Sequence, residues 1–387
     1  MIYLDYAATT PISEKAMEVY SSVAQRYFGN ASSLHEAGSS ALQIKEASAR
    51  AIAQSLGADA KAIHFTSGAT ESSFLAIRAL LDGLSPSKNH IITSTIEHAS
   101  IIDVFRKLEE EGYSVSWLKV NEQGEVSLED LKSIITKETA LVSIQHVNSE
   151  IGTIQPIKEI GAFLKEKEIL FHSDMVQSYG KLPLDVKALP IDALSISAHK
   201  IYGPKGIGAV WINPEVEWKP YFYDPDDRPK LKKGTDNVPA MAAFAAAAKE
   251  TISEAEKEFE RVSKFKKQFT QALKGLDYEF VEEGDPGKSS PYILGARFPG
   301  IEGQFLMLEC DQAGIAISTG SACQVGSEKP NRTMKGIGRT DEEARQFVRF
   351  SFGKNVKEEQ LGEIIGKIDT ILSRHFSKVR KKTASEA

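Results

Sequence analysis

Lys200 lies where an apolar segment gives way to a turn rich in glycine and proline. Residues 191–197 before it read as a buried strand, and residues 203–208 after it read as the turn. Burial and neighbouring cations lower the pKa of a lysine in such a place, and its neutral amine is then a nucleophile toward an aldehyde. The ordinary alternative is a surface lysine that opens a turn. Lys200 is therefore a candidate Schiff-base lysine, if other residues support it.

Three further segments place polar residues just past expected strands. Small residues at 67–70 turn a strand into a helix, so that backbone amides and the Thr70 hydroxyl could approach a phosphate. His98 could stack on an aromatic ring, and Asp174 could keep a pyridinium nitrogen protonated. Each alone has an ordinary explanation: an empty turn, a structural histidine, a helix N-cap. Together with Lys200 they predict a pyridoxal phosphate pocket.

The two cysteines predict different roles. Cys310 lies in an apolar run and is expected to fill the core. Cys323 lies in a polar segment without helical or strand periodicity, which predicts a mobile loop at about 320–335. A thiol there could act as a nucleophile in the pocket and then carry sulfur outward. Two cysteines in 387 residues do not indicate a disulfide framework.

Alternating strand and helix patterns position these residues. The pattern predicts an α/β fold with a mostly parallel seven-stranded sheet, because strands separated by helical crossovers pair in parallel. The expected strands are 62–66, 90–94, 114–118, 140–144, 169–172, 193–197 and 208–212.

A second, smaller α+β domain is expected toward the C-terminus. One long helix at about 239–276 is predicted to bridge the two parts, with further strands near residues 278–281, 293–298, 315–317 and 347–351. We expect a large cofactor-binding domain at 15–255. Residues 1–14 and 256–387 are expected to form the small domain, which carries the cysteine loop.

Composition narrows the function classes. The chain has 47 basic and 53 acidic residues, a formal net charge of −6, which argues against a general nucleic-acid surface. No apolar run is long enough for a membrane span, and the N-terminus lacks a leader pattern. The sequence therefore predicts a cytoplasmic protein without membrane or direct nucleic-acid partners, and it indicates no metal site.

Several motifs, in this order, resemble the NifS/IscS-type cysteine desulfurases of the class V aminotransferase group, which are fold type I pyridoxal phosphate enzymes. The resemblance runs from residue 2 to about residue 370. It is carried by the segments at 3–11, 29–30, 67–71, 97–98, 146–152, 199–206 and 318–323.

The resemblance implies a role for each matching residue. Lys200 would form the imine with pyridoxal 5'-phosphate, Asp174 would pair with the ring nitrogen, Gln177 would bind the ring 3-oxygen, and His98 would stack on the ring and carry protons. Cys323 would receive sulfur from L-cysteine as a persulfide, leaving L-alanine. The implied phosphate ligands are Ala69, Thr70, Ser197 and His199, with Thr235 from a second subunit of a homodimer, and the implied substrate ligands are Asn148, Arg349 and Asn30.

Arg349 is also a candidate on its own pattern. It alternates with apolar neighbours in a strand, and a planar guanidinium suits bidentate binding of a carboxylate. The alternative is an arginine on a solvated strand face.

The sequence also departs from the family pattern. Residues 224–233 are rich in Asp, Pro and Lys where relatives carry glycines, and Lys233 replaces an arginine. The chain stops soon after His375, without the longer tail that some relatives use to dock an iron-sulfur scaffold. A specialised sulfur acceptor is therefore expected, such as a tRNA-thiolating enzyme or a cofactor-assembly protein, besides an iron-sulfur scaffold. Alternatives are an aminotransferase or selenocysteine lyase on the same scaffold, or a catalytically weak sulfur-relay subunit.

Overall fold

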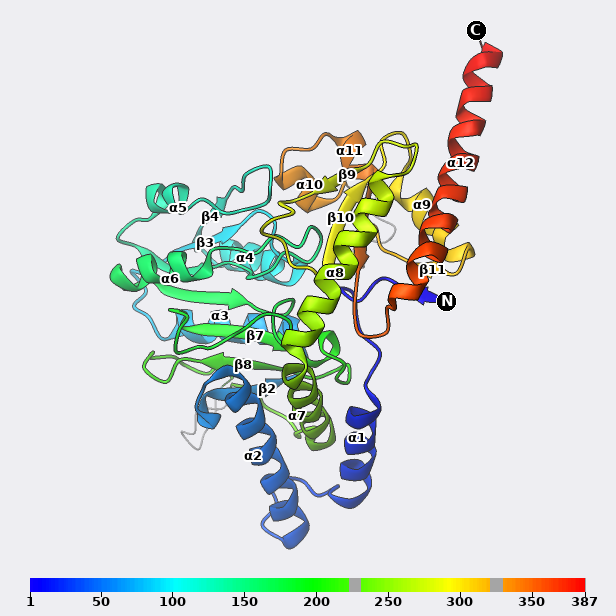
Figure 1. Ribbon diagram of the computed structural model, residues 1–387. Helices are drawn as coiled ribbons and strands as arrows, with labels where there is room; N and C mark the ends of the chain where they lie inside the picture. Colours follow the sequence, from blue (N-terminus) through cyan, green and yellow to red (C-terminus); the bar gives the residue numbers. More distant parts are fainter. Residues whose placement is uncertain (223–230, 321–329, 387) are drawn as a thin grey trace.

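A seven-stranded sheet forms the centre of the larger part of the molecule (Figure 1). The computed structural model describes the backbone of residues 1–222, 231–320 and 330–386, and side chains as far as residue 377. Across the sheet the strands are β2 (Ile63–Thr66), β8 (Gly208–Ile212), β7 (Ala193–Ser197), β6 (Leu170–Asp174), β5 (Thr139–Ser143), β3 (His90–Ser94) and β4 (Ser114–Leu118). Only the pairings that β8 makes are antiparallel. The expected mostly parallel seven-stranded sheet is confirmed.

Helices cover both faces of this sheet because successive strand residues point to opposite sides. In β5, Leu141 packs with one set of helices and Val142 with the other, and Ala193 and Leu194 divide in the same way. One face carries α3 (Ala69–Asp82) and α4 (Ala99–Glu110), and the other carries α2 (Glu36–Leu56), α5 (Leu128–Ile134), α6 (Ile157–Glu166) and α7 (Val238–Ser253). Burial on both faces explains why these strands read as continuous apolar runs.

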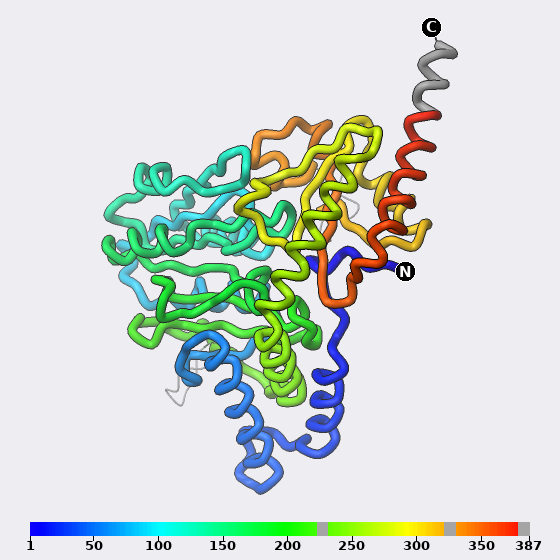
Figure 2. Tube along the Cα trace, in the orientation of Figure 1, coloured from blue at the N-terminus to red at the C-terminus, as the bar shows by residue number. Residues whose placement is uncertain are grey.

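Helix α1 (Glu14–Arg26) packs on α7 through small residues. Ala16, Ala243 and Ala247 are fully buried where the two helices meet. Figure 2 follows the chain from the N-terminus, beside the smaller part, to α1 and then α2 at the far edge of the molecule. The segment between residues 5 and 13 therefore crosses from one part to the other.

The smaller part is built on a three-stranded antiparallel sheet, in the order β12 (Phe347–Ser351), β10 (Ile293–Arg297) and β9 (Val281–Glu283). Aromatic side chains fill its core, and Phe269 contacts both Phe350 and Phe352. Its helices are α8 (Ala255–Lys274), α9 (Gly303–Gln312), α10 (Arg332–Gly336), α11 (Asp341–Arg345) and α12 (Leu361–Glu386).

The N-terminus belongs structurally with this smaller part. Strand β1 (Ile2–Tyr3) pairs in parallel with β11 (Ile315–Ala316), and Ile2 and Leu4 lie in the same apolar core as Phe350. This pairing agrees with the expected placement of residues 1–14 beside residues 256–387. The domain boundaries themselves stay a prediction.

The expectation of a single helix over 239–276 was wrong. The chain forms α7 and α8 with Glu254 between them, where the Glu254 N–H bonds the carbonyls of Thr251 and Ile252 instead of the residue four positions back. Helix α7 packs on the large sheet and α8 on the small one, so the break lets each helix bury its apolar face against a different core.

Within the described ranges, no helix is long and apolar enough to cross a membrane. The same ranges contain no cluster of potential metal-ligating side chains.

Candidate active site

The carboxyl ends of the central strands surround a cavity of about 510 Å³. Asp174 ends β6, Ser197 ends β7, and Lys200 follows in a short 3₁₀ turn. His98 lies past the end of β3 as the N-cap of α4. All four line the cavity, because the strand ends of a doubly wound sheet open on one crevice.

One end of the cavity is suited to an anion. Helix α3 begins there at Ala69 and Thr70, so its free backbone amides and its positive dipole end face the cavity. Gly68, at φ 153°, adopts a backbone conformation that L side chains rarely adopt. Among the described residues, the buried Ser197 hydroxyl has no hydrogen-bond partner. An oxygen-rich group at this end would satisfy Ser197 and the helix amides together.

His199 lies at the same end. Its Nδ1 lies 3.1 Å from the Thr9 hydroxyl, and its backbone carbonyl accepts from Thr10. Burial lowers the pKa of His199 to about 4, with the charges of Lys200, Lys205 and other cations adding to the effect. His199 is therefore a neutral hydrogen-bonding group, held in place by the N-terminal segment.

Lys200 reaches into the middle of the cavity. Its Nζ donates to the carbonyl oxygens of Ala7 at 2.5 Å and Ala8 at 2.9 Å. Both acceptors belong to the N-terminal segment, which lies beside the turn 198–202. Two carbonyls hold the amine toward the cavity and not toward solvent. The alternative of an ordinary surface lysine does not fit this environment.

Asp174 and His98 face the cavity together. The Asp174 carboxylate accepts from the Val176 N–H at 2.9 Å, and burial raises its pKa while the nearby His98 opposes that rise. Burial lowers the pKa of His98, and Asp174 opposes that fall. The Nδ1 of His98 accepts from the Ser100 N–H at 3.2 Å. A buried carboxylate that lacks a full counter-charge would be stabilised by a protonated ring nitrogen.

Gln177 lines the same wall. Its Nε2 donates to the Ala7 carbonyl at 2.9 Å, and its Oε1 accepts from Lys181 at 3.2 Å. Its amide nitrogen therefore faces Ala7, which also accepts from Lys200. The predicted ligand of the ring oxygen and the predicted imine lysine therefore donate to the same carbonyl oxygen.

Arg349 reaches the cavity from β12 of the smaller part. It is 2% exposed, so the alternative of a solvated strand face is wrong. Its Nη1 donates to the Ser149 carbonyl at 2.9 Å and its Nη2 to Asp5 at 2.6 Å. Among the described residues its Nε has no partner. The guanidinium thus keeps a donor for a carboxylate.

Three predicted residues are not brought to this cavity within one chain. Asn148 is 1% exposed, its Nδ2 donates to Ile96, and its Oδ1 accepts from the backbone of Glu150 and Ile151. Asn30 is exposed in the connection between α1 and α2, and Thr235 is exposed before α7. None of the three lines the cavity.

Of the two cysteines, the structure describes Cys310 and not Cys323. Cys310 is fully buried, and burial raises the pKa of its thiol to about 12, which confirms the expected core filler. Cys323 lies outside the described residues, as do residues 224–230 of the segment that departs from the family pattern.

Several functional neighbours were not predicted from the sequence. Lys181, Asp5 and Ala7 contact the predicted site residues directly. Lys181 had one available signal: it follows Gln177 by four positions, just past a strand end. Asp5 and Ala7 had none, since only tertiary structure brings the N-terminal segment to Lys200 and Arg349.

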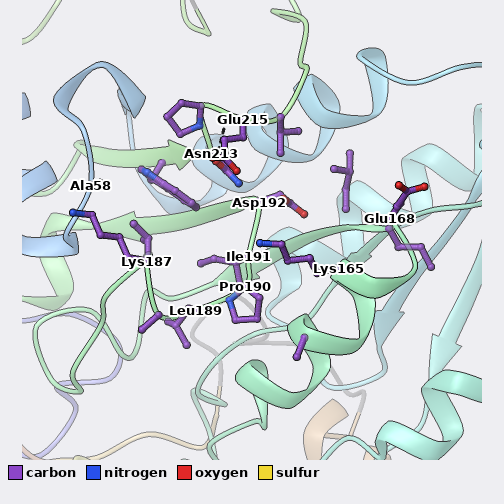
Figure 3. Close-up of a pocket in the computed structure, with 18 of the residues that line it drawn as sticks. Ala58, Lys165, Glu168, Lys187, Leu189, Pro190, Ile191, Asp192, Asn213 and Glu215 are labelled. Carbon is purple, nitrogen blue, oxygen red and sulfur yellow. Dashed lines mark hydrogen bonds between the residues drawn. The ribbon is translucent and has the colours of Figure 1, made fainter.

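A larger hollow of about 950 Å³ lies at the other end of these strands, near the amino ends of β6 and β7 (Figure 3). Residues near the start of β6 and β7 and just past the end of β8 line it, including Leu170, Asp192 and Asn213. Asp192 accepts from the Phe171 N–H at 2.8 Å, so it ties two strands together. This hollow is not lined by a combination of residues like Lys200, Asp174 and His98 of the smaller cavity. We therefore place the active site at the smaller cavity.

The fold and the site define a pyridoxal phosphate enzyme of fold type I. A family model for "Aminotransferase class-V" matches residues 2–364, and the chain belongs to that family. A protein of Bacillus subtilis (strain 168) named NifS is 47% identical over 367 residues, 94% of this chain and 93% of that protein. The cysteine desulfurase IscS of Dictyoglomus turgidum is 35% identical over 373 residues, 96% of this chain and 95% of that protein.

The fold is also similar to a solved structure described as a NifS-like protein. The TM-score is 0.89 at 30% sequence identity, and the match covers 96% of this chain and 99% of that one.

The residues present fit pyridoxal phosphate, the cofactor of this family. The unpartnered Ser197 hydroxyl and the start of α3 suit the phosphate, Asp174 suits the ring nitrogen, and Lys200 lines the same cavity. When bound, this cofactor supplies an aldehyde and an electron-accepting ring.

Proposed function

We propose that the protein is a pyridoxal phosphate-dependent cysteine desulfurase that converts L-cysteine to L-alanine and transfers the sulfur to Cys323 as a persulfide. One observation carries the proposal: Lys200, Asp174, His98 and Arg349 line one cavity of about 510 Å³. The similarity to the cysteine desulfurase IscS named above supports the choice of L-cysteine.

Lys200 serves as the amine that binds the cofactor and then as a base. The carbonyls of Ala7 and Ala8 accept its protons and orient the amine toward the cavity. With the cofactor bound, this amine would be the group that removes the Cα proton of the substrate. The same two carbonyls are acceptors for the resulting ammonium.

Arg349 binds the substrate carboxylate. Asp5 and the Ser149 carbonyl hold two edges of the guanidinium, which leaves Nε as a donor. A fixed, buried guanidinium can select an α-carboxylate by charge and by geometry.

His98 carries protons between the reacting atoms. Its lowered pKa leaves the ring neutral at physiological pH. Because Nδ1 accepts from Ser100, the proton of the neutral ring resides on Nε2. His98 thus offers one defined N–H to the cavity.

Cys323 is the proposed sulfur carrier. Its thiolate attacks the substrate sulfur, a sulfur–sulfur bond forms, and the carbon–sulfur bond breaks with its electron pair left on the carbon fragment. Protonation of that fragment leads to L-alanine. This role rests on the sequence resemblance around residues 318–323.

The test compares Cys323→Ala with Cys310→Ala as a matched control, since Cys310 is fully buried in the core. L-alanine release and persulfide, trapped with an alkylating reagent and located by mass spectrometry, are measured with L-cysteine as substrate. We expect Cys323→Ala to lose persulfide formation and sulfur transfer, and Cys310→Ala to retain both. Undiminished sulfur transfer by Cys323→Ala would favour a lyase or an aminotransferase on this scaffold.

A second variant tests the cofactor lysine. Purified protein is expected to show the visible absorption band of a lysine-bound cofactor, and Lys200→Ala is expected to lose it. Persistence of the band in Lys200→Ala would contradict the assignment. A cofactor-loaded wild type without turnover of L-cysteine would instead favour a sulfur-relay subunit.

A homodimer and a sulfur-acceptor protein complete the proposal. Asn30 and Thr235 are exposed on their own chain, as residues that complement a partner's cavity must be. The acceptor, a tRNA-thiolating enzyme or an iron-sulfur scaffold, and the cytoplasmic location rest on the sequence alone. Purification from the native cell with trapping of a mixed disulfide at Cys323 would identify the acceptor, and recovery of none would contradict protein-mediated delivery.

A further inference from the structure

Lys181 is a buried lysine to which the proposed reaction gives no role. It is 7% exposed and lies seven residues past the end of β6. Its Nζ donates to Gln177 Oε1 at 3.2 Å and lies 5.7 Å from the centre of the Tyr292 ring. Within the described residues it forms no ion pair with a carboxylate. Burial of an amine without a counter-charge is costly, so its retention calls for a reason.

A chain of hydrogen bonds joins Lys181 to Lys200. Lys181 donates to Gln177 Oε1, Gln177 Nε2 donates to the Ala7 carbonyl at 2.9 Å, and Lys200 donates to the same carbonyl at 2.5 Å. Every member of this chain except Lys181 lines the cavity. Lys181 is thus the outer end of a continuous path to the amine that binds the cofactor.

The oxygen of the Gln177 amide contacts a hydrogen-bond donor, Lys181, and its nitrogen contacts an acceptor, the Ala7 carbonyl. An amine has N–H groups to donate in either protonation state, and a carbonyl oxygen can only accept. A flipped amide would put its NH₂ against the Lys181 amine and its oxygen against the Ala7 oxygen. Lys181 and Ala7 therefore permit one amide orientation, with Nε2 toward Ala7 and the cavity.

We propose that Lys181 is a positioning residue, which orients the Gln177 amide so that its N–H faces the cofactor ring oxygen and whose positive charge acts on Lys200. The inference rests on pyridoxal phosphate as cofactor and does not depend on Cys323 or on the sulfur acceptor.

The charges around Lys181 support the second part of this proposal. Burial, together with the charges of Lys200 and Arg349, lowers the pKa of Lys181 to about 7. Lys181 in turn contributes to lowering the pKa of His199. Because the interaction of two charges is mutual, protonated Lys181 disfavours a positive charge on the Lys200 nitrogen.

The experiment uses Lys181→Met in the cofactor-loaded protein, with Lys266→Met as a matched control. Lys266 is a half-buried lysine, with its pKa lowered by burial to about 8, but it donates to the Ser290 carbonyl and does not line the cavity. The measurements are the cofactor dissociation constant and the pH at which the visible band of the lysine-bound cofactor changes.

In Lys181→Met we expect cofactor affinity to fall about tenfold, because the Gln177 amide loses its fixed orientation. The spectral transition is expected to move about one unit to higher pH. Loss of a neighbouring cation and loss of a donor to the ring oxygen both favour the protonated form, so the two effects have the same sign. Lys266→Met should leave both quantities unchanged. Absence of the visible band in wild-type protein would contradict the cofactor assignment itself.

Two further variants separate positioning from charge. Lys181→Gln keeps an N–H donor without a charge, so we expect affinity within about threefold of wild type and a transition still at higher pH. Lys181→Gln also provides the pH test if Lys181→Met does not fold. In a Gln177→Leu background, Lys181→Met should lose its effect on affinity. An unchanged transition in both Lys181 variants, or an equal loss of affinity with and without Gln177, would overturn the proposal.

Discussion

Arg349 on β12 and Asp5 in the N-terminal segment form an ion pair, with 2.6 Å between Nη2 and Oδ1, at the edge of the cavity that contains Lys200. The pair fixes a guanidinium that is 2% exposed. In Arg349→Lys the charge remains but bidentate geometry is lost. We expect the KM for L-cysteine to rise about tenfold or more with a smaller change in kcat. Steady-state kinetics measure this, and an unchanged visible band shows that the cofactor is still bound; an unchanged KM would remove Arg349 from substrate binding.

The pH dependence of turnover should reflect His98. Burial lowers its pKa below the ordinary value of 6.5, so the neutral ring predominates at neutral pH and is lost only under acidic conditions. We expect kcat/KM for L-cysteine to fall on an acidic limb below pH 6.5. His98→Gln should reduce kcat by about 100-fold and abolish this limb. A limb that persists in the variant would belong to another group.

The buried Glu97 carboxyl predicts a pH effect on stability. Glu97 is 3% exposed, and burial raises its pKa from 4.5 to about 8, although Ser94 and Gln145 donate to it. The folded state therefore keeps the proton that the unfolded chain releases above pH 4.5. Its contribution to stability is complete below pH 4.5 and is lost as the pH rises through about 8.

Glu97→Gln removes this titration. The melting temperature of the variant minus that of wild type should increase between pH 5 and pH 8. Thermal unfolding of both proteins, followed by circular dichroism at several pH values, measures the difference. A difference that is constant with pH would mean that Glu97 ionises normally in the folded protein.

Gly353 lets two aromatic side chains approach the lysine-bearing turn. A Cβ at this position would overlap the Tyr6 ring and lie 2.6 Å from the Tyr202 hydroxyl. Tyr202 has a positive φ of 66° and accepts a hydrogen bond from the Lys354 N–H at 2.8 Å, so the smaller part of the molecule holds a strained residue next to Lys200. Gly353→Ala should lower the free energy of unfolding by about 2 kcal/mol or more.

The same change should also weaken cofactor binding, because Tyr202 follows Lys200 by two positions. Gly362 in α12 is the control, since a Cβ there meets no atom within 4 Å. Gly362→Ala is expected to leave stability unchanged or to raise it by about 0.5 to 1 kcal/mol. Equal unfolding curves for the two variants would contradict the proposed overlap.

The connection between α1 and α2 carries the exposed apolar residues expected of a dimer contact. Leu34 is fully exposed and Phe28 is 78% exposed, on either side of Asn30. Leu34→Glu should shift the protein toward monomer in sedimentation and reduce activity, because each cavity would lose the partner's residues. Leu308→Glu, at an exposed apolar residue of α9, should change neither. A Leu34→Glu protein that stays dimeric would place the contact elsewhere.

Local pattern was sufficient to predict the strands of the large sheet and to place Lys200 and Asp174 at strand ends. The expected strands 193–197 and 208–212 match β7 and β8 residue for residue. The strand expected at 169–172 extends to Asp174, because β6 continues to pair with β7 beyond the apolar run. Lys200 and Asp174 were recognisable because strand ends in this fold open on one crevice, which depends on the order of elements and not on distant contacts.

The roles of Asn148 and the bridging helix could not be predicted in this way. Hydrogen bonds to Ile96, Glu150 and Ile151 occupy the Asn148 amide, and residue type alone does not show that. The break at Glu254 follows from the packing of α7 and α8 on two separate cores. Helical periodicity continues across Glu254, so the sequence pattern did not indicate the break.

The sequence by itself determined the α/β sheet, because strands and helices follow from residue type and local periodicity. It also placed Lys200 and Asp174 at strand ends, and the role of Cys323 stays a prediction from the resemblance at residues 318–323. Tertiary structure alone decided that Ala7, Asp5 and Lys181 surround these groups. Hydrogen bonds between residues far apart in the chain, such as the one from Lys200 to Ala7, form only when the smaller part and the N-terminal segment close over the strand ends.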